Sequence, residues 1–194
     1  YLRLHRALWL VDEPYEVDDT SRYSKYFDTV FIQDPSTLAR HEHAHYLPVC
    51  YDPSRHFDAG RERIYKAGFV GANNKTRLKH LTAAARKGYL SYLVGGPWVG
   101  PSVLKHLSLG VYLHPSEVAE MYQQTQVVIN IWREQHHFNA RKTPGYSLNP
   151  RIYEALACGA LVVTEDRAEL DSVFPGLPTF SNPKELVAQL EWLL

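Results

Sequence analysis

Residues 147–164 read SLNPRIYEALACGALVVT, in which a loop, a helix, a glycine and a buried strand follow one another without a gap. Asn149 can cap the helix, and Pro150 suits its first turn, where the missing amide costs nothing. Gly159 suits the stop after the helix. A helix that leads directly into a buried strand is typical of α/β proteins with parallel sheets.

The same alternation of strands and helices extends along the chain. After residue 66 we expect strands at 67–70, 90–94, 111–113, 127–131 and 160–164, and helices at 74–87, 102–107, 115–124, 150–157 and 183–194. Before residue 50 we expect strands at 7–11, 28–32 and 45–49, with helices at 20–26 and 35–42. Strands joined by crossover helices predict Rossmann-type parallel sheets in both parts. The last helix carries an apolar face suited to covering a sheet, formed by Leu186, Val187, Leu190, Leu193 and Leu194.

A polar, turn-rich stretch, YDPSRHFDAGRER at 51–63, is typical of a linker. We therefore expect a partial N-terminal domain at 1–57, a linker at 58–66 and a complete C-terminal domain at 67–194. The chain has no initiating Met and opens almost directly on a strand-like segment, so we expect a fragment of a longer protein.

Composition narrows the function classes. Lys and Arg number 21 and Asp and Glu number 21, so the net charge is zero, and we expect no nucleic-acid partner. Cys50 and Cys158 are too few for a disulfide framework or a four-thiolate zinc site, which favours the cytoplasm. The first ten residues, YLRLHRALWL, do not resemble a signal peptide, and no apolar run approaches the roughly 18 to 20 residues of a membrane span.

The start of the helix at 150–157 is a candidate anion site. Exposed amides there bind anions readily, and Arg151 adds a guanidinium in the first turn, so a diphosphate would fit. Glu154 lies three residues after Arg151 on a neighbouring part of the same face, and its carboxylate could accept two hydrogen bonds from a ribose. A surface ion pair between the two side chains explains the spacing equally well.

Two stretches, HPSEVAEMYQQTQVVIN at 114–130 and SLNPRIYEALACGALVVTE at 147–165, resemble the C-terminal domain of GT-B glycosyltransferases. They are most similar to the group 1 type, in particular its spore-maturation-protein-like branch, over residues 66–194. Three further stretches resemble the last part of that family's N-terminal domain: WLVDEP at 9–14, FDTVFIQDP at 27–35 and YLPVCYDPSRHF at 46–57.

This resemblance implies a GT-B-like α/β fold and a glycosyltransferase that moves a sugar from a nucleotide-diphosphate sugar to an unknown acceptor, without a metal or cofactor. It also implies that Glu154 holds the ribose, while Arg151 and the amides around Asn149 and Pro150 bind the diphosphate. The family's acidic residue before a Gly-rich turn is missing from the loop WREQHHFNARKTPGYSLN at 132–149, so Glu134 receives no role.

That loop contains a cationic cluster able to help hold phosphates or a sugar hydroxyl, formed by Arg133, His136, His137, Arg141 and Lys142. Of these we take His137, Arg141 and Lys142 as candidate ligand contacts, although a solvated loop explains them equally well. Long loops are often functional, but this does not identify any single residue of the cluster as a ligand contact.

Another candidate is FVGANNKTR at 69–77, where a strand ends in Gly71 and a helix follows within three residues. Glycine permits close backbone approach to a ligand. The resemblance implies that this turn faces the donor, with Arg77 near the phosphates; a tight turn and a solvated arginine are the alternative. His114 follows another strand, at the edge where a nucleotide base would lie, and turn formation alone would also explain it.

Asp12 and Glu13 follow an apolar strand, on the side where parallel sheets bind ligands, and either could act as the base that deprotonates an acceptor hydroxyl. They could instead cap the turn at Pro14. The run His41, His43 and His45 spans a helix end and a strand start, so its rings need not converge and we expect no metal site there.

Two other classes of protein remain open. The same helix would suit a non-catalytic nucleotide-sugar-binding module or a partner subunit. A response-regulator-like or flavodoxin-like signalling domain would share the alternation of strands and helices. A signalling domain of this kind would carry a cluster of acidic residues at its strand ends. The sequence of the C-terminal domain shows no such cluster after Val70.

Overall fold

The computed structural model describes residues 4–133 and 137–194, which form two compact units. Unit 1 comprises 1–49, 134–149 and 167–173, and unit 2 comprises 50–133, 150–166 and 174–194. Each unit is therefore assembled from separate stretches of the chain. The domain bounds expected from the sequence were contiguous, and they stay a prediction.

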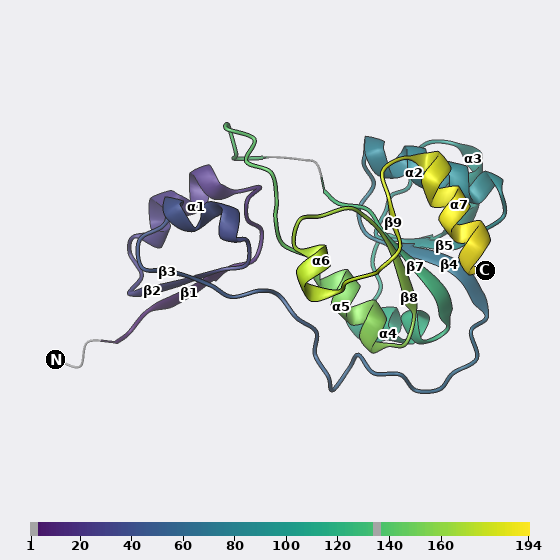
Figure 1. The fold of residues 1–194 in the computed structure, drawn as a ribbon, viewed down its shortest axis with the longest axis horizontal. Helices are drawn as coiled ribbons and strands as arrows, with labels where there is room; N and C mark the ends of the chain where they lie inside the picture. Colours follow the sequence, from purple (N-terminus) through teal and green to yellow (C-terminus); the bar gives the residue numbers. More distant parts are fainter. Residues whose placement is uncertain (1–3, 134–136) are drawn as a thin grey trace. The chain divides into compact units, whose positions relative to one another are not determined.

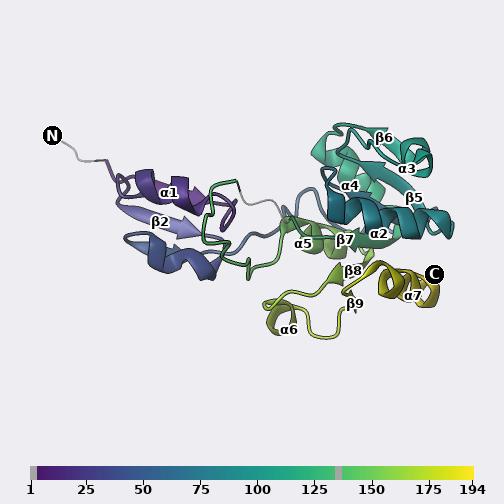
Figure 2. The same ribbon diagram turned by 90° about the horizontal axis from the view of Figure 1, so that it is seen from above.

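Unit 1 is a small parallel sheet covered by helices. Its elements are β1 (Ala7–Leu10), α1 (Val17–Ser24), β2 (Thr29–Ile32), the 3-10 helix η1 (Pro35–Arg40), β3 (Ala44–Tyr46) and α6 (Leu170–Val173). The strands are parallel in the order β1-β2-β3. In Figures 1 and 2, α1 and η1 lie side by side over the same face of these strands. Leu10, Val30 and Ile32 are buried beneath them and form the core of the unit.

Unit 2 is a doubly wound α/β fold. Its strands are β4 (Tyr65–Val70), β5 (Leu90–Val94), β6 (Ser108–Gly110), β7 (Thr125–Asn130), β8 (Leu161–Glu165) and β9 (Thr179–Phe180). Its helices are α2 (Lys75–Arg86), α3 (Ser102–Leu107), α4 (Pro115–Gln123), α5 (Pro150–Ala157) and α7 (Pro183–Leu193). The strands are all parallel, in the order β6-β5-β4-β7-β8-β9. Helices α2 and α7 cover one face of the sheet, and α4 and α5 cover the other (Figure 1).

The core of unit 2 lies between the central strands and the helices on each side. Phe69, Leu93, Val127 and Ile129 from the strands are fully buried. Because both faces of the sheet are covered, these strands are apolar over most of their length, as expected for a parallel sheet. The predicted α/β class with Rossmann-type parallel sheets is confirmed. None of the helices in the described ranges is both long and apolar enough to cross a membrane.

Several predicted elements differ from the structure. The strand expected at 111–113 is wrong: β6 lies just before it, and Val111 and Tyr112 are 62% and 73% exposed. The segment expected to be a helix at 35–42 forms the 3-10 helix η1. Helix α6 and strand β9 were not predicted. Helix α6 has only four residues and β9 only two, which is too short for a recognisable sequence pattern.

The stretch expected to be a linker is bound firmly to unit 2. Nη1 of Arg63 donates hydrogen bonds to the carbonyls of Tyr122, Gln123 and Cys158 at 3.0, 2.6 and 3.1 Å, at the ends of α4 and α5. A guanidinium at the ends of two helices satisfies carbonyls that have no partner within the helix and stabilises both dipoles. Strand β4 begins at Tyr65, inside the predicted linker.

Candidate functional site

The strand order of unit 2 places a switch point between β4 and β7. From β4 the chain runs outward to β5 and β6, and it then returns to β7 on the other side. In open α/β sheets the connections leave in opposite directions at such a point, and ligands bind in the crevice beyond the carboxyl ends of the two strands. The last residues of these strands are Val70 and Asn130.

Arg151, in the first turn of α5, lies at this switch point. Its Nε donates to the carbonyl of Val70 at 2.7 Å, and its Nη1 donates to Oδ1 of Asn130 at 2.5 Å. Its guanidinium also lies 4.9 Å from the centre of the Phe69 ring. Burial lowers the pKa of Arg151, but a guanidinium stays protonated at neutral pH. These contacts therefore fix a positive charge across the ends of both central strands.

A second guanidinium reaches the same place from α2. Arg77 donates from Nε and Nη2 to the carbonyl of Ile131 at 3.2 and 3.0 Å, and from Nη1 to the carbonyl of Ala72 at 2.8 Å. It lies 5.3 Å from the centre of the Phe69 ring. The alternative of a solvated Arg77 is wrong, because the side chain is buried and joins the loops that follow β4 and β7. Two positive charges thus share one aromatic ring.

Gly71 allows the first guanidinium to approach the β4 loop. A Cβ atom at Gly71 would lie 2.7 Å from Nη2 of Arg151, and the backbone φ of Gly71 is +155°. The neighbouring Gly95, after β5, packs directly on the Gly71 backbone, where a Cβ would lie 2.8 Å from the Gly71 carbonyl carbon. Glycine is required at both positions by close packing and by a backbone conformation that other residues rarely adopt.

Glu154 forms no ion pair with Arg151 in the described parts of the chain, so the interpretation of these residues as a surface ion pair is wrong. The guanidinium is directed toward the strand ends instead. Burial raises the pKa of Glu154, and the nearby side chains of His56, Arg151 and Arg55 lower it. Glu154 is a half-buried carboxyl on the same face of α5, one turn beyond Arg151.

In unit 1, two buried carboxylates hold the loop that leads to the start of α5. Oδ2 of Asp34 accepts hydrogen bonds from the amides of Tyr146 and Ser147 at 2.7 and 3.0 Å. Oε2 of Glu169 accepts from the amide of Leu148 at 2.7 Å. Three successive amides are therefore fixed by charged acceptors, which form the stronger class of hydrogen bond.

Neither carboxylate was predicted from the sequence. Asp34 lies 112 residues from Tyr146 along the chain. Its only local signal is its place before Pro35, which predicts the cap that it supplies to η1 by accepting from the Ser36 amide at 3.0 Å.

The other donor-site candidates are placed as follows. His114 is the exposed N-cap of α4 and accepts from the Ser116 amide at 3.3 Å, while its own amide donates to Glu117 at 2.7 Å. These two hydrogen bonds form a capping box, so His114 has the turn-forming role given above as the alternative. A contact between His114 and a base stays a prediction. Pro150 is the first residue of α5, as predicted.

The candidate loop contacts lie in unit 1 and are exposed. Nδ1 of His137 lies 3.6 Å from Oε1 of Glu16, and Lys142 has a backbone φ of +52°. Arg141 is exposed near Asp18. The amide of Ala140 and the side chain of Arg40 hold the pKa of Asp18 below its ordinary value. Glu134 and His136 lie outside the described residues.

The two candidate catalytic carboxylates of unit 1 have opposite surroundings. Asp12 is exposed at the end of β1. Glu13 is 1% exposed, accepts a hydrogen bond from the Thr20 hydroxyl and lies 3.6 Å from Nε2 of His41. This burial argues against Glu13 as the acceptor base.

The three histidines at 41–45 do not share one environment. His41 is buried against Ser24 and Glu13. His43 has a backbone φ of +52°, and the His45 ring lies 6.1 Å from the Phe31 ring. Within the described ranges, no group of three or more His, Cys, Asp or Glu side chains could hold a metal ion.

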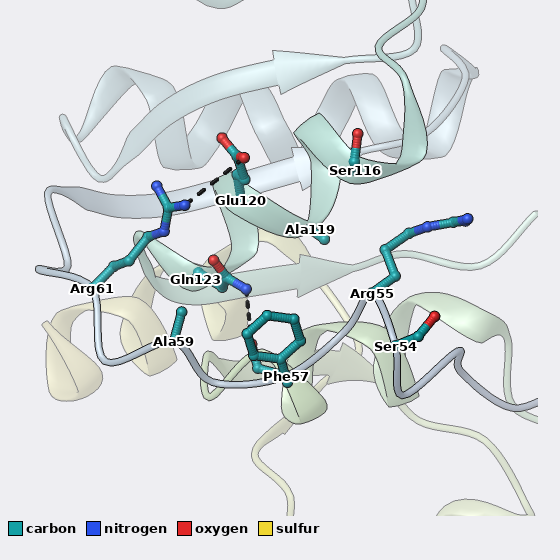
Figure 3. A pocket seen from close by; sticks show the side chains of 9 residues that line it. All are labelled: Ser54, Arg55, Phe57, Ala59, Arg61, Ser116, Ala119, Glu120 and Gln123. Carbon is teal, nitrogen blue, oxygen red and sulfur yellow. Dashed lines mark hydrogen bonds and ion pairs between the residues drawn. The ribbon is translucent and has the colours of Figure 1, made fainter.

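Unit 2 also contains a pocket of about 320 Å³ between the segment 54–61 and α4. Figure 3 shows the side chains that line it: Ser54, Arg55, Phe57, Ala59, Arg61, Ser116, Ala119, Glu120 and Gln123. Sequence reasoning missed this pocket, because the segment was interpreted as a linker.

Comparisons with known proteins give one family and one fold. Residues 73–194 match the model of a family described as glycosyl transferase-like, which is more than half of the 194-residue chain. Among solved structures, the chain is similar to AviGT4, described as a glycosyltransferase involved in avilamycin A biosynthesis, with a TM-score of 0.56 and 16% identity. The match covers 85% of this chain and 55% of that one. No curated protein matches the chain.

Proposed function

Because the chain belongs to the glycosyl transferase-like family, we propose that it binds a nucleotide-diphosphate sugar and serves transfer of the sugar to an acceptor. The chain spans about 55% of the length of the solved glycosyltransferase that it resembles. Activity, donor and acceptor are therefore part of the proposal, as are the spore-maturation-like branch and a cytoplasmic location.

The observation that carries the proposal is the fixed positive charge at the switch point. Arg151 donates hydrogen bonds to two neutral acceptors, the Val70 carbonyl and the Asn130 amide oxygen. No carboxylate of the described residues lies within ion-pair distance of it, and Glu154 attracts it only from beyond that distance. A buried charge is stabilised when an ion of opposite sign completes its surroundings. A diphosphate at the amides of the first turn of α5 would supply that ion.

The proposed roles follow the order of groups along α5. Arg151 and the amides at the helix start bind the diphosphate and stabilise the charge that develops on it when the sugar departs. Glu154, one turn further, accepts hydrogen bonds from the ribose hydroxyls. Arg77 positions the loops after β4 and β7. The positive charge comes from guanidinium groups and helix amides, so the proposal includes no metal and no cofactor.

A second candidate is a module that binds the nucleotide sugar without turning it over. The burial of Glu13 favours it, since of the two candidate bases only Asp12 is exposed. Release of the nucleoside diphosphate from a nucleotide sugar in the presence of acceptor would separate the enzyme from the binding module.

Nucleotide binding itself is tested by thermal unfolding. UDP, GDP or dTDP should raise the melting temperature, and at about 100 times its dissociation constant the ligand adds roughly 2.7 kcal/mol to the free energy of unfolding. Absence of a shift with all three diphosphates at millimolar concentration would contradict the proposal.

A further inference from the structure

We propose that the outer surface of α2 and α7 in unit 2 docks on an anionic membrane surface, where Arg86, Lys87 and Lys184 hold the head group of an acidic phospholipid. The inference goes beyond the proposed function, because these side chains lie outside the switch point and receive no role in nucleotide binding. It concerns the surface on which the protein works rather than the reaction.

A groove of about 500 Å³ lies between α2 and α7, which are neighbours on one face of the sheet (Figures 1 and 2). Six residues line the groove: Ala83, Arg86 and Lys87 from the end of α2, and Pro183, Lys184 and Val187 from the start of α7. Half of them are apolar and half carry a positive charge. The volume is in the range of ligand sites, and an apolar floor with a cationic rim suits an anion that has an apolar body.

The three cations of the groove have no acidic partner among the residues that the structure describes. Their side chains are exposed, and none lies within ion-pair distance of a carboxylate in those ranges. Glu185, which follows Lys184 directly, is bound elsewhere: its carboxylate accepts from the Ser181 amide at 2.7 Å and from Nδ2 of Asn182 at 2.6 Å. Positive charges without a counter-charge at the rim of one groove attract anions.

The positive charge continues along α2. This helix, KTRLKHLTAAAR, has no acidic residue, and its exposed charged residues are Lys75, Lys79 and Arg86. They lie four and seven residues apart, which places them on one stripe, opposite the buried Leu81 and Ala84. The net charge of zero for the whole chain therefore conceals one basic helical surface.

An exposed tryptophan lies on the neighbouring helix. Trp192 is 77% exposed and follows Lys184 by eight residues, so the helical repeat turns both toward the solvent side of α7. Tryptophan is enriched at the interface between membrane and water, where its ring lies at the level of the head groups. Surfaces that combine Lys and Arg with exposed Trp are typical of proteins that lie on anionic membranes.

An acidic membrane accounts for more of these features than an acidic segment of a partner protein. The carboxylates of such a segment would pair with the cations, but they would leave the apolar floor of the groove and Trp192 without a role. A phospholipid supplies a phosphate for the cations and acyl chains for the apolar groups. Each Lys or Arg near an anionic membrane surface also strengthens binding, by about fivefold.

The test measures sedimentation of the 194-residue chain with lipid vesicles. Vesicles of phosphatidylcholine alone are compared with vesicles that also contain phosphatidylserine, at low and at high salt. One variant removes the three cations of the groove: Arg86→Gln, Lys87→Gln and Lys184→Gln. The matched control removes three exposed cations outside this surface: Arg22→Gln, Lys25→Gln and Arg61→Gln. Trp192→Ala keeps every charge, and soluble polyglutamate is the probe for an acidic protein partner.

We expect the wild type to bind vesicles that contain phosphatidylserine at low salt, and to bind phosphatidylcholine vesicles far less. The groove variant should bind the acidic vesicles roughly 100-fold less tightly, and the control variant should bind them like the wild type. Trp192→Ala should weaken this binding without removing its dependence on salt. The groove variant should bind a nucleotide diphosphate like the wild type.

Four results would overturn the assignment. The wild type could bind both kinds of vesicle alike, or the groove variant and its control could lose equal affinity. The chain could bind polyglutamate but no vesicle, which would identify an acidic protein as the partner. The groove variant could lose nucleotide binding together with vesicle binding, which would place its cations in the donor site.

Discussion

Replacing Arg151 by alanine should destabilise the fold as well as the anion site. The substitution removes two hydrogen bonds from a charged donor, to the Val70 carbonyl and to Asn130, each worth about 1.5 to 3 kcal/mol. It also removes a contact with the Phe69 ring worth about 0.5 to 1 kcal/mol. We expect a loss of about 3.5 to 7 kcal/mol, a large share of a typical stability of about 5 to 15 kcal/mol.

A double-mutant cycle isolates the contact with Asn130. Urea unfolding at pH 7 of the wild type, Arg151→Ala, Asn130→Ala and the double variant gives the coupling energy directly. The cycle is needed because Asn130 also donates to the Thr164 hydroxyl at 2.9 Å, a bond that only the Asn130 substitution removes. We expect a coupling of about 1.5 to 3 kcal/mol. A cost below about 0.5 kcal/mol for Arg151→Ala, with no coupling, would show that the guanidinium is not fixed at the strand ends.

Two further substitutions test the carboxylates. Glu154→Gln should weaken nucleotide binding by about 1 to 3 kcal/mol. An unchanged affinity would contradict the ribose role. Because burial raises the pKa of Glu154, the wild type should lose stability as the pH rises through that pKa, and the variant should not. Urea unfolding of the wild type and the variant across pH measures this difference. Asp34→Asn should destabilise unit 1 by about 1.5 to 3 kcal/mol and speed hydrogen exchange at the Tyr146 and Ser147 amides. The control Asp171→Asn, at an exposed residue, should change neither the stability nor the exchange. Slow exchange of these two amides in Asp34→Asn would refute the loop contact.

Much of unit 2 could be predicted because its local signals agree. Pro150 and Gly159 delimit α5, and apolar runs mark the central strands, so the predicted α5 bounds match the structure. Strand β6 escaped prediction because an edge strand pairs through its backbone alone. Its residues, Ser108 to Gly110, carry no apolar pattern, and the β-branched and aromatic run just after them was chosen instead.

The site shows the limit of spacing arguments. The sequence placed Arg151 and Glu154 on one face of a helix, which is correct, but spacing alone cannot say which neighbour a side chain meets. The partners of Arg151 lie 81 and 21 residues away along the chain. Asn130 was detectable in principle, since it is a polar residue at the end of an apolar strand.

The central claim is that the start of α5 recognises the diphosphate of a nucleotide, and calorimetry on one conservative variant tests it most directly. Arg151→Lys keeps the charge but lacks the planar fork, so it should fold while binding the diphosphate less well. Arg86→Lys is the control, since Arg86 is exposed at the end of α2.

Each variant is titrated with the diphosphate that the wild type binds and with the matching nucleoside. We expect Arg151→Lys to weaken the diphosphate about tenfold or more, roughly 1.4 kcal/mol, and to leave the nucleoside within about twofold of the wild type. Equal losses for both ligands, or no loss for either, would show that Arg151 does not bind the diphosphate.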